Sequence, residues 1–194
     1  MYDKIYEQKE FLTDLDNAIA DGDHGINMAK GFAAVVQKLP QLADKDIGTV
    51  FKTVGMTIVS AVGGSAGPLY GTAFMKAGVV MSGKYAMDMA ELLACLRAAV
   101  EGVMLRGKAV CGEKTMLDAM IPALEAMEQA NAAGLSPREI LASGVAAAES
   151  GVEFTKTIAA TKGRASYIGE RSIGHQDPGA TSFTFLLAVI ADAV

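Results

Sequence analysis

Apolar residues recur at helical spacing along this chain, and no alternating strand pattern competes with them. One apolar face ends before Pro40 and consists of Met28, Phe32, Val35, Val36 and Leu39. A second stripe begins at Met89, a capping box of Ser136 and Glu139 starts a third helix, and the chain ends in a last amphipathic helix. The pattern predicts one all-α domain over residues 1–194, with about eight helices in up-and-down order.

Composition narrows the classes of function. The net charge of −5 argues against a general nucleic-acid surface. Cys95 and Cys111 lack CxxC spacing, which favours buried or incidental thiols in a reducing cytoplasm, and the first residues lack the apolar core of a signal peptide. No charge occurs between Lys52 and Lys76, but glycines interrupt this stretch, so we expect two buried helices that meet at a glycine turn, not a membrane span.

An acidic segment at residues 16–27 is the strongest sign of chemistry. It combines three carboxylates, an imidazole, an amide and two glycines, namely Asp16, Asp21, Asp23, His24, Asn27, Gly22 and Gly25. On a continuous helix Asp16 and Asp21 would lie roughly 140° apart, so they converge only if the chain turns near Asp21. Gly22 and Gly25 permit such a turn. Because clustered carboxylates repel one another, the segment predicts a site for a hard divalent cation.

The spacing of the acidic residues separates magnesium from calcium. An EF-hand loop that began at Asp16 would have Ala18 at its third position and Asn27 at its twelfth, which does not fit that motif. Mg²⁺ shared with the phosphates of a ligand fits better, since Mg²⁺ takes few protein carboxylates. The alternative is an acidic turn that only caps the following helix.

Two further segments between helices have the composition of phosphate or nucleotide contacts. The glycine-rich residues 63–71 offer main-chain amides to a phosphate, and the alternative is close helix packing through small residues. In residues 106–116, Gly107 can admit a flat ring and Met116 can cover it, although a methionine taken alone is more often a core residue.

The last such segment is residues 162–180. Arg164 can pair with a phosphate through both arms of its guanidinium, although alone it would be a solvated surface charge. The turn at Asp177 can present main-chain groups to a ligand. We expect His175, which has no neighbouring ligand residue, to be structural, and His24, which adjoins the carboxylates, to donate to a phosphate oxygen.

Together these segments resemble the nucleotide-binding L subunits of dihydroxyacetone kinases. The matching stretches follow the order of that family across nearly the whole chain, at residues 15–28, 63–71, 107–108, 112–116, 163–167 and 177–180. The resemblance implies a closed antiparallel barrel of eight amphipathic helices, with ADP and two Mg²⁺ at one rim.

The resemblance also implies roles for particular residues. The implied metal ligands are Asp16, Asp21 and Asp23. The implied phosphate-side contacts are His24, Gly25, Ile26, Asn27, Ser65 and Ala66, and the positions around the nucleotide are Gly107, Met116, Arg164, Asp177, Pro178 and Gly179. One departure concerns Ser65-Ala66, because relatives often have Ala-Ser there, so the hydroxyl is moved by one residue.

The function implied by the resemblance is a phosphoryl relay. ADP would stay bound as a coenzyme, receive a phosphoryl group from a phosphohistidine on an M subunit of the phosphotransferase system, and pass it to dihydroxyacetone on a separate K subunit. The nucleotide would carry the group, so no residue of this chain is expected to be modified. Two alternatives stay open: a kinase subunit that exchanges ATP and acts on another short sugar, and a nucleotide-loaded regulatory module that docks on a transcription regulator.

Overall fold

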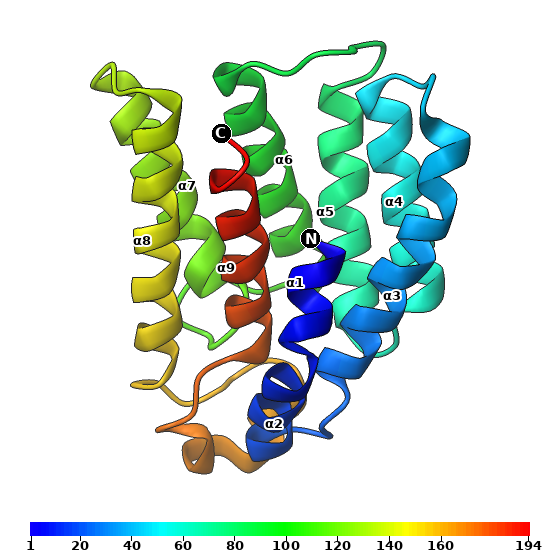
Figure 1. Cartoon of the computed structure of the whole chain (residues 1–194). Coiled ribbons are helices and arrows are strands. Elements are labelled where there is room, and N and C mark those ends of the chain that lie inside the picture. Colours follow the sequence, from blue (N-terminus) through cyan, green and yellow to red (C-terminus); the bar gives the residue numbers. More distant parts are fainter. The chain divides into compact units, whose positions relative to one another are not determined.

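The chain is all-helical, which confirms the fold class that the apolar spacing predicts. The computed structural model describes residues 1–194 and contains no β-strand. Two short 3-10 helices, η1 (Leu39–Leu42) and η2 (Arg164–Ser172), accompany nine α-helices (Figure 1). The α-helices are α1 (Tyr2–Glu7), α2 (Lys9–Ile19), α3 (His24–Lys38), α4 (Ile47–Ala61), α5 (Ala66–Val80), α6 (Met89–Gly107), α7 (Leu117–Ala132), α8 (Pro137–Thr155) and α9 (Pro178–Ala191).

The chain divides into two compact units. The first unit comprises Met1, Asp3–Ile26 and Ala109–Val194, and the second comprises Tyr2 and Asn27–Lys108. The boundary falls inside α3, whose first turn belongs to the first unit. The single domain and the closed barrel stay predictions.

In the first unit, α7, α8 and α9 lie side by side (Figure 1). Two glycines of α8 allow close contact with α7, because a Cβ atom on Gly151 would lie 2.0 Å from the Asp118 carbonyl oxygen and one on Gly144 would lie 2.5 Å from Met127 Cγ. The predicted capping box starts α8, with Ser136 Oγ accepting from the Glu139 N–H and Glu139 accepting from the Ser136 N–H.

Helix α2 is held against α9 and η2 in the same unit. The rings of Phe11 and Phe185 lie 6.4 Å apart between their centroids. At the other end of α2, Ile19 is buried in a small apolar cluster with Ala160 and Ala165, and Ile168 packs against this cluster. The end of α2, from which the acidic segment continues, is therefore anchored on the segment that leads into η2.

In the second unit, α4 and α5 form an antiparallel pair with closely spaced backbones. A Cβ atom on Gly55 would lie 2.6 Å from the Gly71 carbonyl oxygen, and one on Gly48 would lie 2.7 Å from the Gly78 carbonyl oxygen. The turn between the helices contains Gly64 at φ +64°. These contacts confirm the predicted pair of helices that meet at a glycine turn.

Helix α6 continues the second unit on the other side of α5 (Figure 1). A capping box of Asp88 and Glu91 starts it. Its Cys95 is buried against Ala77 and Met81, so this thiol is a core residue, as expected.

The predicted apolar face of α3 is only partly correct. Met28, Phe32 and Val35 are buried, but Val36 and Leu39 are each 43% exposed. Successive helical residues point about 100° apart, so Val36 turns away from the face that buries Val35.

The uncharged stretch between Lys52 and Lys76 falls in α4, the glycine turn and α5, as predicted. No helix in the structure combines the length and the apolar character that crossing a membrane requires.

Asp46 connects the start of α4 to the loop after α5. Its carboxylate accepts from the Thr49 N–H at 3.1 Å, the Thr49 hydroxyl at 2.5 Å and the Gly83 N–H at 2.9 Å. The Thr49 side-chain hydrogen bond, followed by the Gly83 N–H, lowers the pKa of Asp46 to about 2.

Replacing Asp46 should change how stability depends on pH. Because the folded pKa lies below the unfolded value of 3.8, the carboxylate stabilises the fold above pH 4, and this contribution disappears as the pH falls through 2. Asp46→Asn should therefore lower the urea midpoint at pH 7, and the difference from wild type should shrink toward pH 3. Asp14→Asn, at an exposed position of α2, is the control and should not reproduce this trend.

Adding a methyl group between α4 and α5 should destabilise the fold. Gly55→Ala would push the helices apart, at a cost of about 1–3 kcal/mol in the free energy of unfolding measured with urea. Met56→Ala, at an exposed neighbouring position, should cost less than about 0.5 kcal/mol. Equal effects of the two substitutions would show that the close approach is unimportant.

Candidate metal and nucleotide site

The structure brings the three predicted metal ligands together at the junction of α2 and α3. Helix α2 ends at Ile19, and a turn of four residues leads to His24, the first residue of α3. One ligand atom each of Asp16, Asp21 and Asp23 lies within 4.8 Å of the others. Asp16 is buried in the last turn of α2, whereas Asp21 is exposed. The chain therefore leaves the helix before Asp21, as convergence of the carboxylates requires.

Asp16 also caps the start of α3. Its Oδ2 accepts from the main-chain N–H of Asp23 at 2.8 Å and of His24 at 3.1 Å. The capping interpretation of the acidic turn is thus confirmed for Asp16. A carboxylate oxygen has more than one lone pair, and Oδ1 is a further acceptor, so the cap and a bound cation are compatible.

The two glycines of the acidic segment have different roles. Gly22 has φ +71°, and a Cβ atom there would lie 1.8 Å from Asn17 Oδ1, so this residue makes the turn, as predicted. Gly25 does not, because it is already inside α3. A Cβ atom on Gly25 would lie 2.0 Å from the Lys9 carbonyl oxygen, so the expectation that Gly25 contributes to the turn is wrong and its small size serves helix packing.

His24 is buried, and its ring is engaged within the first unit. Nε2 lies 2.9 Å from Ser182 Oγ, and this hydroxyl donates to the Gly179 carbonyl at 3.1 Å. The His24 ring and the Ser182 hydroxyl thus form a hydrogen bond in which the tautomer of the imidazole sets which group donates. Burial lowers the pKa of His24 to about 4, against an opposing effect of Asp16. At neutral pH the imidazole is therefore uncharged. Donation from His24 to a phosphate stays a prediction.

Arg164 lies beside the acidic cluster. Its Nη2 is 3.2 Å from Asp21 Oδ2, and its side chain is 61% exposed. The guanidinium therefore offsets part of the negative charge of the carboxylates, and its exposed part can meet an anion bound to a cation in the cluster.

The start of α9 gathers most of the remaining predicted residues of the first unit. Asp177 caps the helix by accepting from the Ala180 N–H at 2.7 Å, and Pro178 occupies the first turn. A Cβ atom on Gly179 would lie 3.4 Å from Met116 Cβ, so these two residues are neighbours. Met116 is buried at the start of α7, which fits its alternative interpretation as a core residue.

Ile26, a predicted phosphate-side contact in the first turn of α3, is 54% exposed.

The predicted residues of the second unit lie at helix ends. Asn27 is next to the glycine turn, since a Cβ atom on Gly63 would lie 3.1 Å from Asn27 Nδ2. Ser65 is exposed and makes no capping hydrogen bond with its side chain, and Ala66 starts α5, where main-chain N–H groups have no partner within the helix. Gly107 is the exposed last residue of α6.

Sequence reasoning missed three buried polar residues around these loops: Lys114, Asp118 and Thr155. Asp118 accepts from the main-chain N–H groups of Gly112 at 2.5 Å and Thr115 at 2.7 Å. Thr155 Oγ1 accepts from the Asp177 N–H at 2.9 Å. A lysine near a loop glycine, or an aspartate in the first turn of a helix, is normally solvated, and nothing in the local sequence signals burial.

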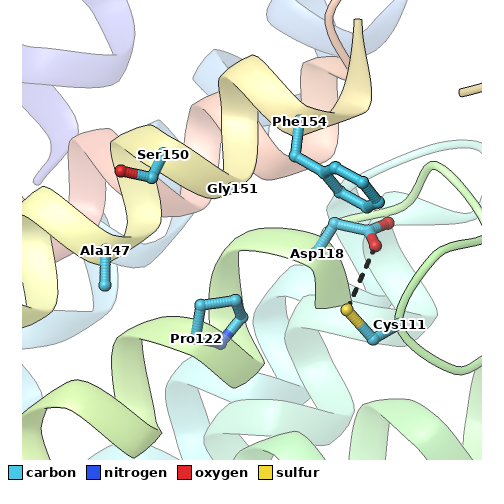
Figure 2. A pocket seen from close by; sticks show the side chains of 7 residues that line it. All are labelled: Cys111, Asp118, Pro122, Ala147, Ser150, Gly151 and Phe154. Carbon is cyan, nitrogen blue, oxygen red and sulfur yellow. Dashed lines mark hydrogen bonds between the residues drawn. The ribbon is translucent and has the colours of Figure 1, made fainter. Parts of the chain in front are cut away.

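A pocket of about 360 Å³ lies between α7 and α8 in the first unit (Figure 2). None of the predicted site residues lines it; its walls are Cys111, Asp118, Pro122, Ala147, Ser150, Gly151 and Phe154. The Cys111 thiol donates to Asp118 Oδ1 at 3.4 Å, as the dashed line in Figure 2 marks. Burial raises the pKa of this thiol, so Cys111 is not an activated nucleophile.

The donor set of the acidic cluster fits magnesium. All three groups are carboxylates, and neither cysteine nor histidine supplies a ligand atom to the cluster. Hard oxygen ligands suit Mg²⁺ or Ca²⁺, and Mg²⁺ leaves positions for water or phosphate oxygens. The fold and this cluster define an all-helical protein with a candidate site for a hard divalent cation at a helix junction.

The chain belongs to the DAK2 domain family, whose model matches residues 18–192. It is 48% identical over 184 residues to a protein of Escherichia coli (strain K12) named PEP-dependent dihydroxyacetone kinase, ADP-binding subunit DhaL, with 95% of this chain and 88% of the relative covered. A relative from Listeria innocua, named PEP-dependent dihydroxyacetone kinase 1, ADP-binding subunit DhaL, is 45% identical over 184 residues, or 95% of this chain and 87% of that protein. The family resemblance of the sequence is thereby confirmed.

A solved structure supports the fold. The crystal structure of the dihydroxyacetone kinase of C. freundii in its native form matches with a TM-score of 0.78 and 24% identity. The match covers 100% of this chain and 33% of that longer chain. At this identity the likeness concerns the fold alone.

Removing one carboxylate should strongly weaken cation binding at the cluster. Asp21→Ala leaves two carboxylates and should remove most of the stabilisation that millimolar Mg²⁺ gives to the wild type, which would be about 2.7 kcal/mol at a hundredfold excess over Kd. Thermal unfolding with and without Mg²⁺ measures this effect. The matched control is Asp14→Ala, an exposed aspartate of α2 outside the cluster, which should respond to Mg²⁺ like the wild type. An unchanged Mg²⁺ response in Asp21→Ala would contradict the metal assignment.

Proposed function

We propose that this chain is the ADP-binding subunit of a PEP-dependent dihydroxyacetone kinase. The observation that carries the proposal is the three-carboxylate cluster of Asp16, Asp21 and Asp23 in a chain that is 48% identical to a subunit of that name. The relatives are named as ADP-binding subunits, which supports a bound nucleotide in this chain. The acidic cluster would hold the metal ions of that nucleotide. The protein would thus be an enzyme subunit that takes part in phosphoryl transfer.

The residues around the cluster suit a nucleotide with two Mg²⁺ ions. When bound, the nucleotide would carry the phosphoryl group while the metal ions neutralise its charge. Asp16, Asp21 and Asp23 would hold the metal ions. Main-chain N–H groups at the start of α3, from Gly25 and Ile26, suit phosphate oxygens because the first turn of a helix leaves such groups without a helical partner.

Further groups would complete the nucleotide contacts. Arg164 would stabilise phosphate charge from its position beside Asp21. At the start of α5, Ser65 and Ala66 would offer a hydroxyl and main-chain N–H groups, with Asn27 near the same turn. We assign the surroundings of the base to Gly107, Met116, Pro178 and Gly179, as the family resemblance implies.

The proposal requires two partner proteins. Dihydroxyacetone would be bound by a separate K subunit, and the phosphoryl group would come from a phosphohistidine on an M subunit of the phosphotransferase system in the cytoplasm. This chain would hold the nucleotide still while the group passes between the partners. Positioning and charge neutralisation are what a phosphoryl transfer mainly requires of a protein.

The nucleotide content of the purified protein tests the proposal. After long dialysis against Mg²⁺ buffer, denaturation followed by chromatography should release close to one ADP per chain. A tightly held coenzyme survives dialysis, because its dissociation is slow compared with the exchange of buffer.

Three other outcomes would count against the proposal. A protein that emerges empty and binds added ATP reversibly would be a kinase subunit with exchangeable ATP. A protein that retains ADP but supports no PEP-driven transfer with K and M subunits would favour a regulatory module. Binding of no nucleotide at all would overturn both the relay and the alternatives.

A further inference from the structure

Lys114 is the most deeply buried charged side chain of the loop before α7. It is 1% exposed, and its backbone has φ +59°, in the left-handed region that side chains rarely adopt. A buried ammonium group needs partners for its three protons. The sequence and the proposed function assign it no role.

The partners of the ammonium are three main-chain carbonyls of the first unit. Nζ donates to the carbonyl oxygens of Thr155 at 2.5 Å, Ile158 at 3.4 Å and His175. Thr155 is the last residue of α8. Carbonyl groups at the C-terminal end of a helix have no partner within the helix, and this end carries the negative end of the helix dipole. Lys114 therefore acts as a cationic cap for α8, supplied from another part of the chain.

These carbonyls lie at the two ends of one segment, residues 156–177: Thr155 directly precedes the segment, Ile158 is near its start and His175 is near its end. The segment leaves α8 through Ile158, passes through η2 and returns through His175 to α9. The Gly174 N–H donates to the Lys156 carbonyl at 2.8 Å, which also brings the two ends together. Lys114 thus joins the start and the end of the segment through its hydrogen bonds.

The neighbouring residue Glu113 reinforces the same contact. Its carbonyl accepts from the Thr161 N–H at 3.3 Å, and its carboxylate lies 3.8 Å from Lys162 Nζ. The loop before α7 therefore holds the 156–177 segment at several points, with Lys114 as the buried one.

The segment carries residues of the candidate site. Arg164 reaches Asp21 of the acidic cluster from η2, and Asp177 caps α9. The position of Arg164 and the cap formed by Asp177 both depend on how the segment leaves α8 and joins α9. Ala160 and Ala165 pack on Ile19, at the end of α2, so a shift of the segment would also disturb the support of the acidic turn.

We propose that Lys114 is a positioning residue of the nucleotide site, which holds the 156–177 segment so that Arg164 stays beside Asp21. The inference rests on the proposed function for its effect on ADP, but its structural part stands independently. Lys114 would not touch the nucleotide and would act through Arg164 and the start of α9.

The test compares Lys114→Met with the wild type by two measurements. Without the hydrogen bonds of the ammonium group, the 156–177 segment should open more often. Trypsin should therefore cleave after Arg164 and Arg171, both exposed in η2, at least about tenfold faster in native protein. The dissociation rate of ADP in Mg²⁺ buffer should rise by a similar factor.

A matched control separates local positioning from general stability. Leu141→Ala removes a fully buried side chain from α8 in the same unit, and it should destabilise the protein globally without speeding cleavage or ADP release to the same degree. Equal effects of Leu141→Ala and Lys114→Met, at matched stability, would overturn the proposal. So would wild-type cleavage and ADP release in Lys114→Met.

A second variant covers the case in which Lys114→Met does not fold. Lys114→Gly removes the ammonium group but relaxes the left-handed backbone, because glycine favours positive φ. It should show the same faster cleavage. Failure of both variants to fold would make Lys114 a general folding residue and overturn the positioning role. If the wild type retains no ADP, the proposed function fails, and cleavage alone decides the role of Lys114.

Discussion

Close approach of helix backbones is the constraint on which each unit of this protein depends. Glycine allows it at matched positions of α4 and α5, and again where α8 contacts α7, because any larger residue would meet main-chain atoms of the neighbouring helix. Rigidly packed helices fix the positions of their own ends. The candidate functional residues lie at such ends, so their placement within each unit follows from the packing.

Charge repulsion in the acidic turn is offset by groups from several elements. Asp16 accepts hydrogen bonds from two main-chain N–H groups at the start of α3, and Asp21 forms an ion pair with the Arg164 guanidinium of η2. These contacts let three carboxylates lie within 4.8 Å of one another and still leave oxygen atoms for a cation. His24 adds no charge at neutral pH, since burial lowers its pKa. The turn is thus both a helix cap and a candidate metal site.

The membership in the DAK2 family gives this arrangement its chemical context. The two ADP-binding subunits described above, from Escherichia coli and Listeria innocua, are 48% and 45% identical to it over 95% of the chain. In a relay of the proposed kind the protein contributes geometry and electrostatics, and the bound nucleotide contributes the reactive group. A buried lysine that holds the segment bearing Arg164 would then affect the site without contacting the nucleotide.

The sequence by itself determined the all-helical class, the capping box at Ser136 and the turn at Gly22, because helical periodicity, capping boxes and positive φ are local properties of a few neighbouring residues. It also determined the family, since the matching motifs are spread along the chain. Only the tertiary structure decided the pairing of His24 with Ser182, 158 residues away, and the burial of Lys114 among distant carbonyls. It also decided that Gly25 packs against α2 and that Val36 faces solvent. Such contacts depend on which helix faces meet, and no local pattern encodes that choice.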